Sequence, residues 1–310
     1  GISSTSCKAF CQKKDNTMSL KFGDLFNRSK ALLLPGVYDA LSALLAEQAG
    51  FEGVYLSGAS ISYTKLGRSD VGLASVGEIA STLELICDRI KIPVMIDADN
   101  GYGNALNVQR TVRKFERAGA SAIQLEDQAY PKRCGHLQGK QLIECEEMCG
   151  KVQAAVDARK SENTLIVART DAIAVEGLES ALNRAECYAD AGADVLFVEA
   201  PKSIKDMELI VSRLGSKLPL LANMVEGGQT PLLSAKELKK IGYKVVIFPG
   251  GLVRAQTYAT QKFFNKLLGD GSTLKWLDKM VDFHELNKII GTDDLLEKGK
   301  KYDGSKGQSK

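Results

Sequence analysis

A cysteine and a histidine stand one residue apart in the segment PKRCGHLQGK, residues 131–140. Lys132 and Arg133 precede Cys134, and His136 follows it, so cations rather than core residues surround the thiol. Neighbouring positive charges lower the pKa of a thiol and favour the thiolate. We therefore expect Cys134 to serve as an acid or a base near neutral pH.

Glycine and proline interrupt the same segment. Pro131, Gly135 and Gly139 are spaced along it, as in a loop that opens and closes over a site. Zinc is another use of a Cys/His pair, but a zinc site needs about four nitrogen or sulfur ligands, more than C-x-H supplies. Cys145 and Cys149 are four residues apart with no histidine nearby, which is typical of half-buried helix positions. A surface thiol without a task is the simpler alternative, although such a thiol is prone to oxidation.

Carboxylates follow several short apolar runs. Asp97 and Asp99 end the run PVMIDAD, and Glu126 follows AIQL. Oxygen ligands of this kind suit Mg²⁺, which takes one or two carboxylates and keeps positions for water and substrate, with Mn²⁺ as a substitute. A ring of like charges is also costly unless a cation lies within it. For Asp127 and Asp171 we expect instead that the side chains cap the helices that follow.

A scaffold whose strand ends meet could bring these side chains together. Four stretches read alike, with a glycine where a helix should end and then an apolar run, at 49–56, 118–125, 191–198 and 241–248. Glycine suits a helix end, and a short unbroken apolar run is typical of a buried parallel strand. Runs at 32–36, 93–99, 164–170 and 219–224 bring the candidate strands to eight. The sequence thus predicts an α/β fold, a (β/α)8 TIM barrel with its active site at the carboxyl ends of the strands.

Other architectures and uses fit less well. A doubly wound open sheet would usually carry a phosphate-binding fingerprint after its first strand, and PGVYDA is not one. The stretch NGYGN lacks the third glycine and the helix context of a dinucleotide site. A barrel used only as an interaction scaffold should show gaps among the strand-end acids, and here the series is complete.

Composition narrows the class of protein. The chain has 310 residues, 44% apolar residues and a net charge of +3 with acids and bases mixed, so we expect neither a nucleic-acid partner nor a membrane span. Seven scattered cysteines fit reduced thiols in the cytoplasm. Residues 1–17 read as a disordered arm or an expression remnant, with Met18 as a candidate start. Residues 18–310 read as one barrel domain that ends in a flexible lysine- and glycine-rich tail.

Five motifs resemble those of the isocitrate lyase/phosphoenolpyruvate mutase superfamily. They are DADNGYGN (97–104), LEDQ (125–128), PKRCGH (131–136), VARTDA (167–172) and LANMVEGGQTP (221–231). The resemblance spans about Leu32 to Glu285 and implies a (β/α)8 barrel whose eighth helix is swapped between subunits. It also implies a homotetramer built as a dimer of helix-swapped dimers, with the swapped helices at about 272–295.

The resemblance implies roles for the residues that match these motifs. Asp97 and Asp99 correspond to Mg²⁺ positions, and Glu126 to a residue that supports the metal from further out. Cys134 corresponds to the catalytic thiol on a gating loop. The other residues implied in catalysis are Tyr55, His136, Arg169 and Glu199. Those implied in substrate binding are Ser57, Gly58, Asp70, Gly135, Asn223, Thr230 and Arg254.

The implied activity is Mg²⁺-dependent cleavage of a carbon–carbon bond. The substrate would be a 2-hydroxy di- or tricarboxylate of the 2-alkylmalate or 2-methylisocitrate type, and one product an α-keto acid such as pyruvate. Phe283 stands close to where methylisocitrate lyases carry an arginine, which favours the smaller 2-alkylmalates. The alternative is a phosphorylmutase of the same superfamily, which makes and breaks bonds to phosphorus.

Overall fold

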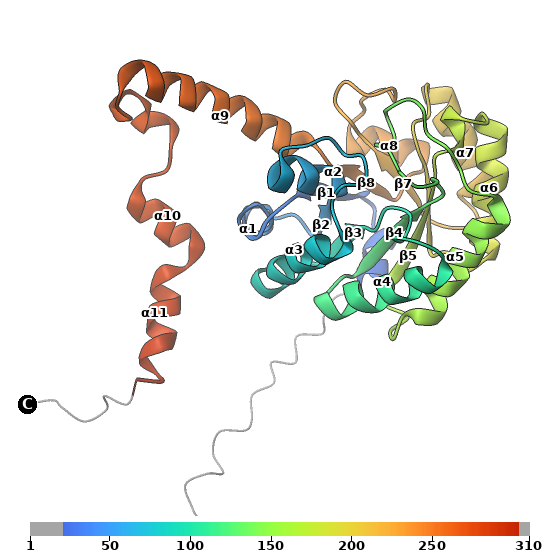
Figure 1. Cartoon of the computed structure of the whole chain (residues 1–310), viewed down its shortest axis with the longest axis horizontal. Helices are drawn as coiled ribbons and strands as arrows, with labels where there is room; N and C mark the ends of the chain where they lie inside the picture. The colour runs from blue at the N-terminus through green and yellow to red at the C-terminus, as the bar shows by residue number, and fades with distance from the viewer. Residues whose placement is uncertain (1–20, 304–310) are drawn as a thin grey trace, which may run out of the picture.

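Eight parallel strands form a closed barrel in the computed structural model, which describes residues 21–303. Neighbouring strands are hydrogen-bonded in chain order, and β8 pairs with β1 to close the barrel (Figure 1). The strands are β1 (Leu32–Val37), β2 (Val54–Leu56), β3 (Val94–Asp97), β4 (Ala122–Glu126), β5 (Leu165–Thr170), β6 (Val195–Val198), β7 (Leu220–Asn223) and β8 (Val245–Phe248). All eight coincide with the predicted apolar runs, so the (β/α)8 barrel is confirmed.

Helices alternate with the strands and surround them. The longer ones are α1 (Ala40–Gln48), α3 (Val76–Arg89), α4 (Ala105–Ala118), α5 (Cys145–Ala158), α6 (Leu178–Asp190), α7 (Ile204–Leu214), α8 (Ala235–Ile241), α9 (Gly251–Asp270), α10 (Phe283–Ile290) and α11 (Thr292–Lys300). Shorter segments are η1 (Phe22–Asn27), α2 (Gly58–Ile61), η2 (Ser62–Leu66), η3 (Ala172–Ala174) and η4 (Leu274–Lys279). The repeated glycines follow helices as predicted: Gly50, Gly119, Gly192 and Gly242 have φ angles of 93°, 108°, 108° and 128°.

Two hydrophobic clusters hold the barrel. The larger one lies between the strands and the helices, and a smaller one fills the barrel interior. The interior cluster includes Phe22, Leu25 and Phe26 of η1, which pack against inward-facing strand residues such as Leu34 and Val245. Because η1 precedes β1, these aromatic and aliphatic side chains plug the amino-terminal end of the barrel. The carboxyl-terminal end is left for polar side chains.

Asp127 links three elements rather than capping a helix, contrary to our expectation. Its carboxylate accepts hydrogen bonds from Thr170 Oγ1 at 2.7 Å, from the Asp171 backbone N–H at 2.9 Å and from Tyr188 Oη at 2.7 Å. Asp171 does not cap η3 either, because both its oxygens accept from the Arg169 guanidinium at 3.0 Å. Asp127 therefore links the ends of β4 and β5, and Asp171 fixes the orientation of the Arg169 guanidinium.

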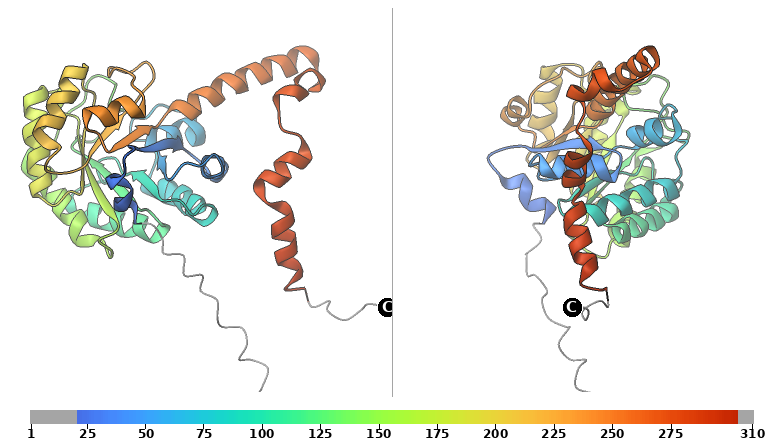
Figure 2. Two further views of the ribbon diagram at one scale, coloured as in Figure 1. Left: turned by 180° about the vertical axis from the view of Figure 1, so that it is seen from behind. Right: turned by 90° about the vertical axis from the view of Figure 1, so that its left-hand side faces the viewer.

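The chain leaves the barrel after β8. Figures 1 and 2 show α9 extending away from the barrel and α10 and α11 running back beside it. The departing chain starts with α9 at Gly251, whose first turn still packs against the barrel with Val253 buried, and the predicted swapped helices at about 272–295 follow it. Gln48 Nε2 and Arg89 donate to the carbonyls of Ile289 and Ile290, at 2.8 and 3.0 Å, and tie the returning segment to α1 and α3. The swap between subunits stays a prediction.

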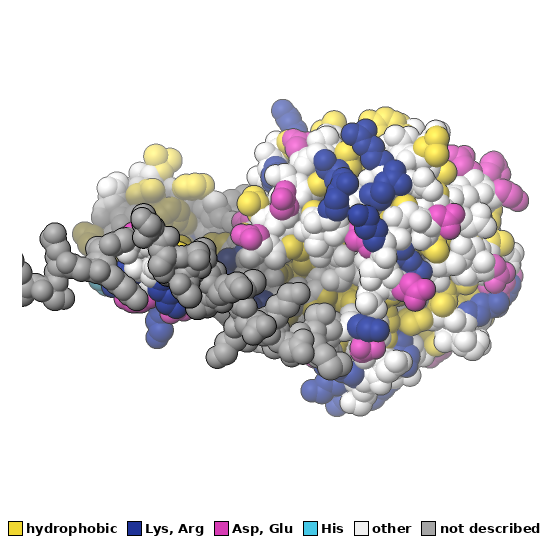
Figure 3. Space-filling view, turned by 90° about the horizontal axis from the view of Figure 1, so that it is seen from below, with side chains coloured by type: hydrophobic (Ala, Val, Ile, Leu, Met, Phe, Trp, Pro, Cys, Tyr) yellow, Lys and Arg dark blue, Asp and Glu magenta, His cyan; other side chains and the backbone are white. Residues whose placement is uncertain are grey.

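The surface mixes charges of both signs. On the face in Figure 3 lysine and arginine form one denser group, and acids are scattered around it. None of the helices described is long and apolar enough to cross a membrane. The predicted arm of residues 1–17 and the last residues of the tail lie outside the described part.

Tyr188→Phe tests the Asp127 cluster. Removing the phenol hydroxyl leaves a buried carboxylate with one donor fewer, so we expect the free energy of unfolding in urea to fall by about 1–3 kcal/mol. Tyr258→Phe is the matched control, because Tyr258 is 64% exposed and should change stability little. Equal stability of the two variants would contradict a stabilising role for the hydroxyl bond.

Candidate active site

A small polar cavity lies at the carboxyl ends of the strands, under the segment 131–140. Its volume is about 50 Å³, well below the few hundred Å³ of a typical ligand pocket. Eleven of the predicted site residues line it: Tyr55, Ser57, Asp70, Asp97, Cys134, Gly135, His136, Arg169, Glu199, Asn223 and Arg254. The remaining predicted residues, Gly58, Asp99, Glu126 and Thr230, do not line this cavity.

Asp97 and Asp99 meet at the end of β3. The Asp99 N–H donates to Asp97 Oδ1 at 3.0 Å, and both carboxylates face Gly58. A Cβ at Gly58 would lie 3.1 Å from Asp97 Oδ2 and 3.4 Å from Asp99 Oδ1, so glycine lets the chain after β2 approach the acids closely. Asp99 itself adopts a left-handed φ of 47°, which turns its carboxylate back toward this point.

Glu126 lies behind this pair, at the end of β4. Its Oε2 is 3.3 Å from Arg169, while its buried Oε1 has no hydrogen-bond partner. Burial, followed by the neighbouring charge of Asp171, raises the pKa of Glu126 well above its usual value despite the nearby Arg169. An unpartnered buried carboxylate oxygen is what a residue that contacts a metal-bound water would present.

The residues present fit a hydrated magnesium ion. Within residues 21–303 no three acidic, histidine or cysteine side chains are arranged to hold a metal by themselves. Mg²⁺ does not need such a set, because it commonly takes one or two carboxylates and completes its octahedron with water and substrate oxygens. Asp97 and Asp99 would supply the carboxylates, with Glu126 reached through water. Burial raises the pKa of Asp99 to about 7 with help from Asp97 and Asp70 and against Lys132, as expected where cation charge is short.

Lys132 anchors the loop to the acids. Its ammonium lies 2.6 Å from Asp70 Oδ1 and 2.6 Å from Asp99 Oδ1 and is 4% exposed. Asp70 also accepts the Cys134 N–H through its backbone carbonyl at 3.3 Å. Burial acts to lower the pKa of Lys132, but Asp99 and Asp70 hold it well above its usual value. Its positive charge is thus committed to carboxylates and not to the thiol.

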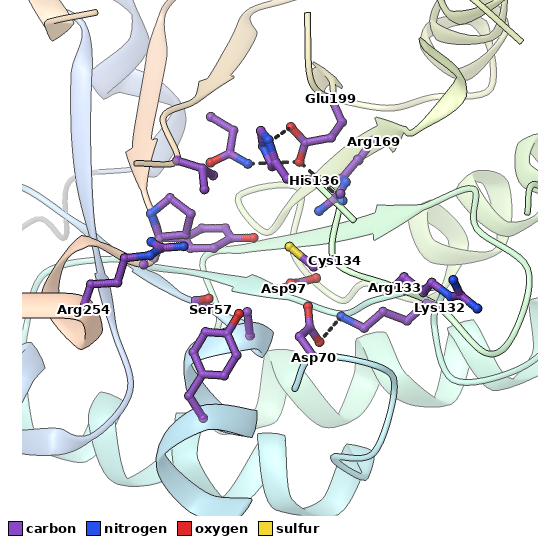
Figure 4. A pocket seen from close by; sticks show the side chains of 18 residues that line it. Ser57, Asp70, Asp97, Lys132, Arg133, Cys134, His136, Arg169, Glu199 and Arg254 are labelled. Carbon is purple, nitrogen blue, oxygen red and sulfur yellow. Dashed lines mark hydrogen bonds and ion pairs between the residues drawn. The ribbon is translucent and has the colours of Figure 1, made fainter. Parts of the chain in front are cut away.

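Cys134 is therefore not the low-pKa thiol that its sequence neighbours indicated. Its side chain lies near the middle of the site, with Asp97 and Asp70 to one side and Arg169 to the other (Figure 4). Burial raises the pKa of Cys134, and the hydrogen bond from the His136 backbone offsets only part of this. The predicted lowering is wrong because burial of the thiol dominates, while the charge of Lys132 is paired with two acids. Cys134 keeps its proton at neutral pH.

His136 closes the loop on the opposite side. Its Nδ1 accepts the Gln229 N–H at 3.1 Å, so the ring proton is placed on Nε2, which lies 3.4 Å from Glu199 Oε1. Gly228 makes room for this ring, since a Cβ there would lie 2.5 Å from Nδ1. Burial alone would raise the pKa of Glu199, but Arg169, His136 and Asn223 lower it to about 2. Glu199 is thus an ionised acceptor that receives the loop.

The backbone of Gly135 rests directly on the barrel rim. A Cβ at this position would lie 2.5 Å from both Arg169 Nη2 and Glu199 Oε2. Lys140 donates to the Gly135 carbonyl from below the loop, and the Gln128 amide bonds both the N–H and the carbonyl of Arg133 at 2.8 Å. These contacts hold the loop in a closed position.

Of the remaining predicted residues, Asn223 and Arg254 have polar groups that could meet a substrate, whereas the hydroxyls of Ser57 and Thr230 are used in a helix cap or lie outside the cavity lining. Asn223 Nδ2 donates to Glu199 at 3.0 Å and leaves its buried Oδ1 free, and Arg254 enters from α9 while pairing with Glu226 at 3.1 Å. Ser57 lines the cavity, but its hydroxyl caps α2 by accepting the Ser60 N–H at 3.1 Å. Thr230 is buried with an unpartnered hydroxyl outside the cavity lining.

Two contributors were missed from the sequence. Tyr63 of η2 lines the cavity, and burial, followed by the nearby Cys134, raises its pKa. Gln124 accepts from Tyr55 Oη at 3.1 Å and approaches Asp97 at 3.5 Å. Gln124 stands two residues before Glu126, so strand alternation places both on one face of β4 and could have revealed it. Nothing in the sequence around Tyr63 points to the site.

Comparison with protein families is decisive for the class of protein. The sequence model described as phosphoenolpyruvate phosphomutase matches residues 22–268. The chain belongs to this family. It is 41% identical over 279 residues to 2,3-dimethylmalate lyase of Eubacterium barkeri, covering 89% of this chain and 95% of that protein. It is 46% identical over 271 residues to 2-methylisocitrate lyase of Aeropyrum pernix, covering 87% and 86%.

A third relative has a different activity in its name. The chloroplastic carboxyvinyl-carboxyphosphonate phosphorylmutase of Arabidopsis thaliana is 41% identical over 286 residues, covering 91% of this chain and 84% of that protein. Among solved structures, a 2,3-dimethylmalate lyase matches with a TM-score of 0.86 at 34% identity, over 93% of this chain and 96% of that one. A phosphonopyruvate hydrolase in complex with oxalate and Mg²⁺ matches with a TM-score of 0.79 at 29% identity, covering 88% and 94%.

Gly135→Ala tests the seating of the loop. The added Cβ would overlap Arg169 and Glu199, so we expect the closed position to be lost and trypsin to cleave after Lys132 and Lys140 severalfold faster, as measured by mass spectrometry of the peptides. Gly150→Ala on α5 is the control, because a Cβ there meets nothing within 4 Å. Equal cleavage rates in the two variants would show that the loop does not depend on this contact.

Proposed function

We propose that the protein is a Mg²⁺-dependent carbon–carbon lyase. The substrate is a 2-hydroxy dicarboxylate of the 2-alkylmalate type, with 2-methylisocitrate as the tricarboxylate variant, and the products are an α-keto acid such as pyruvate and a second carboxylate. The relatives that cleave 2,3-dimethylmalate and 2-methylisocitrate support this class. Phe283 lies on α10 outside this chain's own cavity; if the proposed swap brings it to the site of a second copy, it offers no charge for a third carboxylate, which favours the smaller diacids.

One observation carries the proposal: the loop places a protonated thiol, Cys134, over the buried carboxylates and the arginine of the barrel rim. The barrel rim supplies carboxylates for a cation and the Arg169 guanidinium for an anion, while the loop supplies Cys134. A thiol whose pKa is raised by burial is a proton donor at neutral pH and not a nucleophile. Such a donor above a cation-binding rim suits the quenching of a carbanion.

The side chains would divide the work of binding. Arg169 and the amides around Ser57 and Gly58 would hold the carboxylate next to the hydroxyl, and Arg254 with Asn223 would hold the second carboxylate. When bound, Mg²⁺ would supply a Lewis acid that holds oxygens of the substrate and offsets developing negative charge. Asp97 and Asp99 would hold this ion, with Glu126 reached through water.

Bond cleavage would follow retro-aldol chemistry. The hydroxyl proton would pass to an ionised carboxylate of the barrel rim, its O–H electron pair would form a new carbonyl, and the adjacent C–C bond would break. The electrons of that bond pass to the second fragment as an aci-carboxylate carbanion. Cys134 donates its proton to that carbon, and Tyr55, whose pKa burial and Asp97 raise well above its usual value, stays protonated as a hydrogen-bond donor. Loop closure excludes water, which would otherwise compete as proton source.

The assembly would be a homotetramer of helix-swapped dimers in the cytoplasm. Because α9 leaves, a hollow of about 710 Å³ is open between α1 and α8, with Leu33 and Phe51 in its lining. The departing segment carries large exposed apolar side chains, among them Leu268 at 88%, Phe283 at 77% and Leu274 at 75%. An exchange of helices between two copies would need both features: an open hollow on the barrel and an apolar segment that can fill the hollow of the second copy. Free cysteines at 87, 134, 145, 149 and 187 fit a reducing compartment.

Carboxyvinyl-carboxyphosphonate phosphorylmutase activity is the second candidate. It is favoured by the Arabidopsis relative, which matches over most of both chains. The site itself offers no separate feature for phosphorus chemistry, whereas the protonated thiol has a direct use in the lyase reaction.

The two candidates separate in one assay. Purified protein with Mg²⁺ is incubated with 2-alkylmalates, 2-methylisocitrate, oxaloacetate and phosphonopyruvate, and pyruvate release is followed. We expect pyruvate from a 2-alkylmalate, and loss of all turnover when EDTA removes the metal. If none of these compounds yields pyruvate, the lyase proposal is contradicted and the phosphorylmutase becomes the favoured candidate.

Cys134→Ser tests the proton donor. A serine hydroxyl is a far weaker acid than a thiol, so we expect kcat for pyruvate release to fall by about 10²–10⁴-fold. Mg²⁺ affinity should be retained, because the carboxylates of Asp97 and Asp99, and not the thiol, would hold the ion. Cys87→Ser is the control at a thiol far from the cavity. Wild-type turnover by Cys134→Ser would remove the thiol from the mechanism.

A further inference from the structure

The segment from Asp97 to Asn104 adopts an unusual backbone conformation. Asp99 and Tyr102 have left-handed φ angles of 47° and 63°. Gly101 and Gly103 also have positive φ angles, of 86° and 145°. Left-handed conformations are disfavoured for residues with side chains and persist only where the surroundings enforce them. This segment, here called the β3 loop, carries the Asp99 carboxylate, so whatever enforces its shape also places that carboxylate.

Two buried side chains hold successive carbonyls at the centre of the β3 loop. Lys151 Nζ donates to the carbonyl of Asn100 at 3.0 Å, and Thr111 Oγ1 donates to the carbonyl of Gly101 at 3.1 Å. Lys151 comes from α5 and Thr111 from α4, and each is 3% exposed. The loop is therefore gripped from two helices at adjacent residues.

Lys151 is unusual for a buried cation. Among the described residues no carboxylate lies within 4.0 Å of its ammonium, although Lys132, equally buried, has two. Burial lowers the pKa of Lys151, and Glu147 opposes this only in part. A buried charge without a counter-ion is costly, so its hydrogen bond to the β3 loop is an important compensating contact.

We propose that Lys151, with Thr111, is a positioning residue that holds the β3 loop so that Asp99 faces the metal. Neither side chain contacts the cavity or the reacting atoms. The inference rests on the proposed function, since it concerns the placement of a proposed metal ligand. Groups that orient a metal ligand typically affect metal affinity by about 10–100-fold.

The test is Mn²⁺ binding to the substrate-free full chain, followed by electron paramagnetic resonance. Lys151→Met keeps most of the aliphatic stem and removes the donor, and we expect the Kd for Mn²⁺ to rise about tenfold or more. The sign is diagnostic, because removing a positive charge near the site without moving the loop would tighten Mn²⁺ binding. Thr111→Val removes the other donor without any change of charge and should also weaken binding.

Arg159→Met is the matched control. Arg159 stands at the end of the same helix and donates to the Thr164 carbonyl at 3.0 Å, but it lies away from the β3 loop. The Arg159→Met variant should lose stability without any change in its affinity for Mn²⁺. A second readout needs no metal: hydrogen exchange of the amides at 98–104 should accelerate in Lys151→Met and in Thr111→Val but not in Arg159→Met.

The outcomes separate the two proposals. If the wild-type protein fails to bind Mn²⁺, the proposed function fails and the metal-positioning role fails with it. If the wild type binds and Lys151→Met binds equally or more tightly, only the positioning role is overturned. Should Lys151→Met not fold, Thr111→Val decides in the same way, and wild-type affinity in that variant overturns the proposal.

Discussion

The site depends on an imbalance of buried charge at one end of the barrel. Six buried carboxylates gather there, on Asp70, Asp97, Asp99, Glu126, Asp171 and Glu199. Within residues 21–303, the buried lysines and arginines that form ion pairs with these six acids are Lys132, Lys140 and Arg169. Burial raises the pKa values of Asp99 and Glu126, and the neighbouring acids raise them further, because like charges that are removed from water repel strongly. A divalent cation bound among these carboxylates would offset most of the excess negative charge. This charge imbalance is the physical reason for proposing a metal here.

The loop completes this balance and adds the chemistry. Lys132 brings one cation to Asp70 and Asp99, and His136 and Gly135 settle against Glu199 and Arg169. In this closed position the ion pairs offset part of the buried negative charge, Cys134 lies over the rim and the cavity measures about 50 Å³. Opening of the loop would break these ion pairs.

The sequence predicted the parts of this arrangement that repeat or that follow strand geometry. Glycine-ended helices and apolar runs located all eight strands, and reading the last residues of those runs brought Asp97, Arg169, Glu199 and Asn223 to one cavity. That succeeded because strand ends in a barrel share one rim, whatever their distance along the chain.

Pairings between distant residues could not be predicted. The flanking cations of Cys134 indicated a lowered pKa, but Lys132 is neutralised by Asp70 and Asp99, and burial of the thiol dominates. Asp127 was expected at a helix end, yet it binds Tyr188, which lies 61 residues further along the chain. The departure of α9 from the barrel also has no local signal, because a swapped helix and a packed helix have the same periodicity.

A crystal structure with Mg²⁺ and oxalate would test the central claim most directly, since oxalate resembles the carboxylate and keto oxygens of an α-keto acid product. The account predicts one ion about 2.0–2.1 Å from an oxygen of Asp97 or Asp99, with oxalate bound to that ion and facing Arg169. Cys134 should lie over the ligand with the loop closed. An ion bound elsewhere, or a thiol directed away from the oxalate in a closed loop, would contradict it.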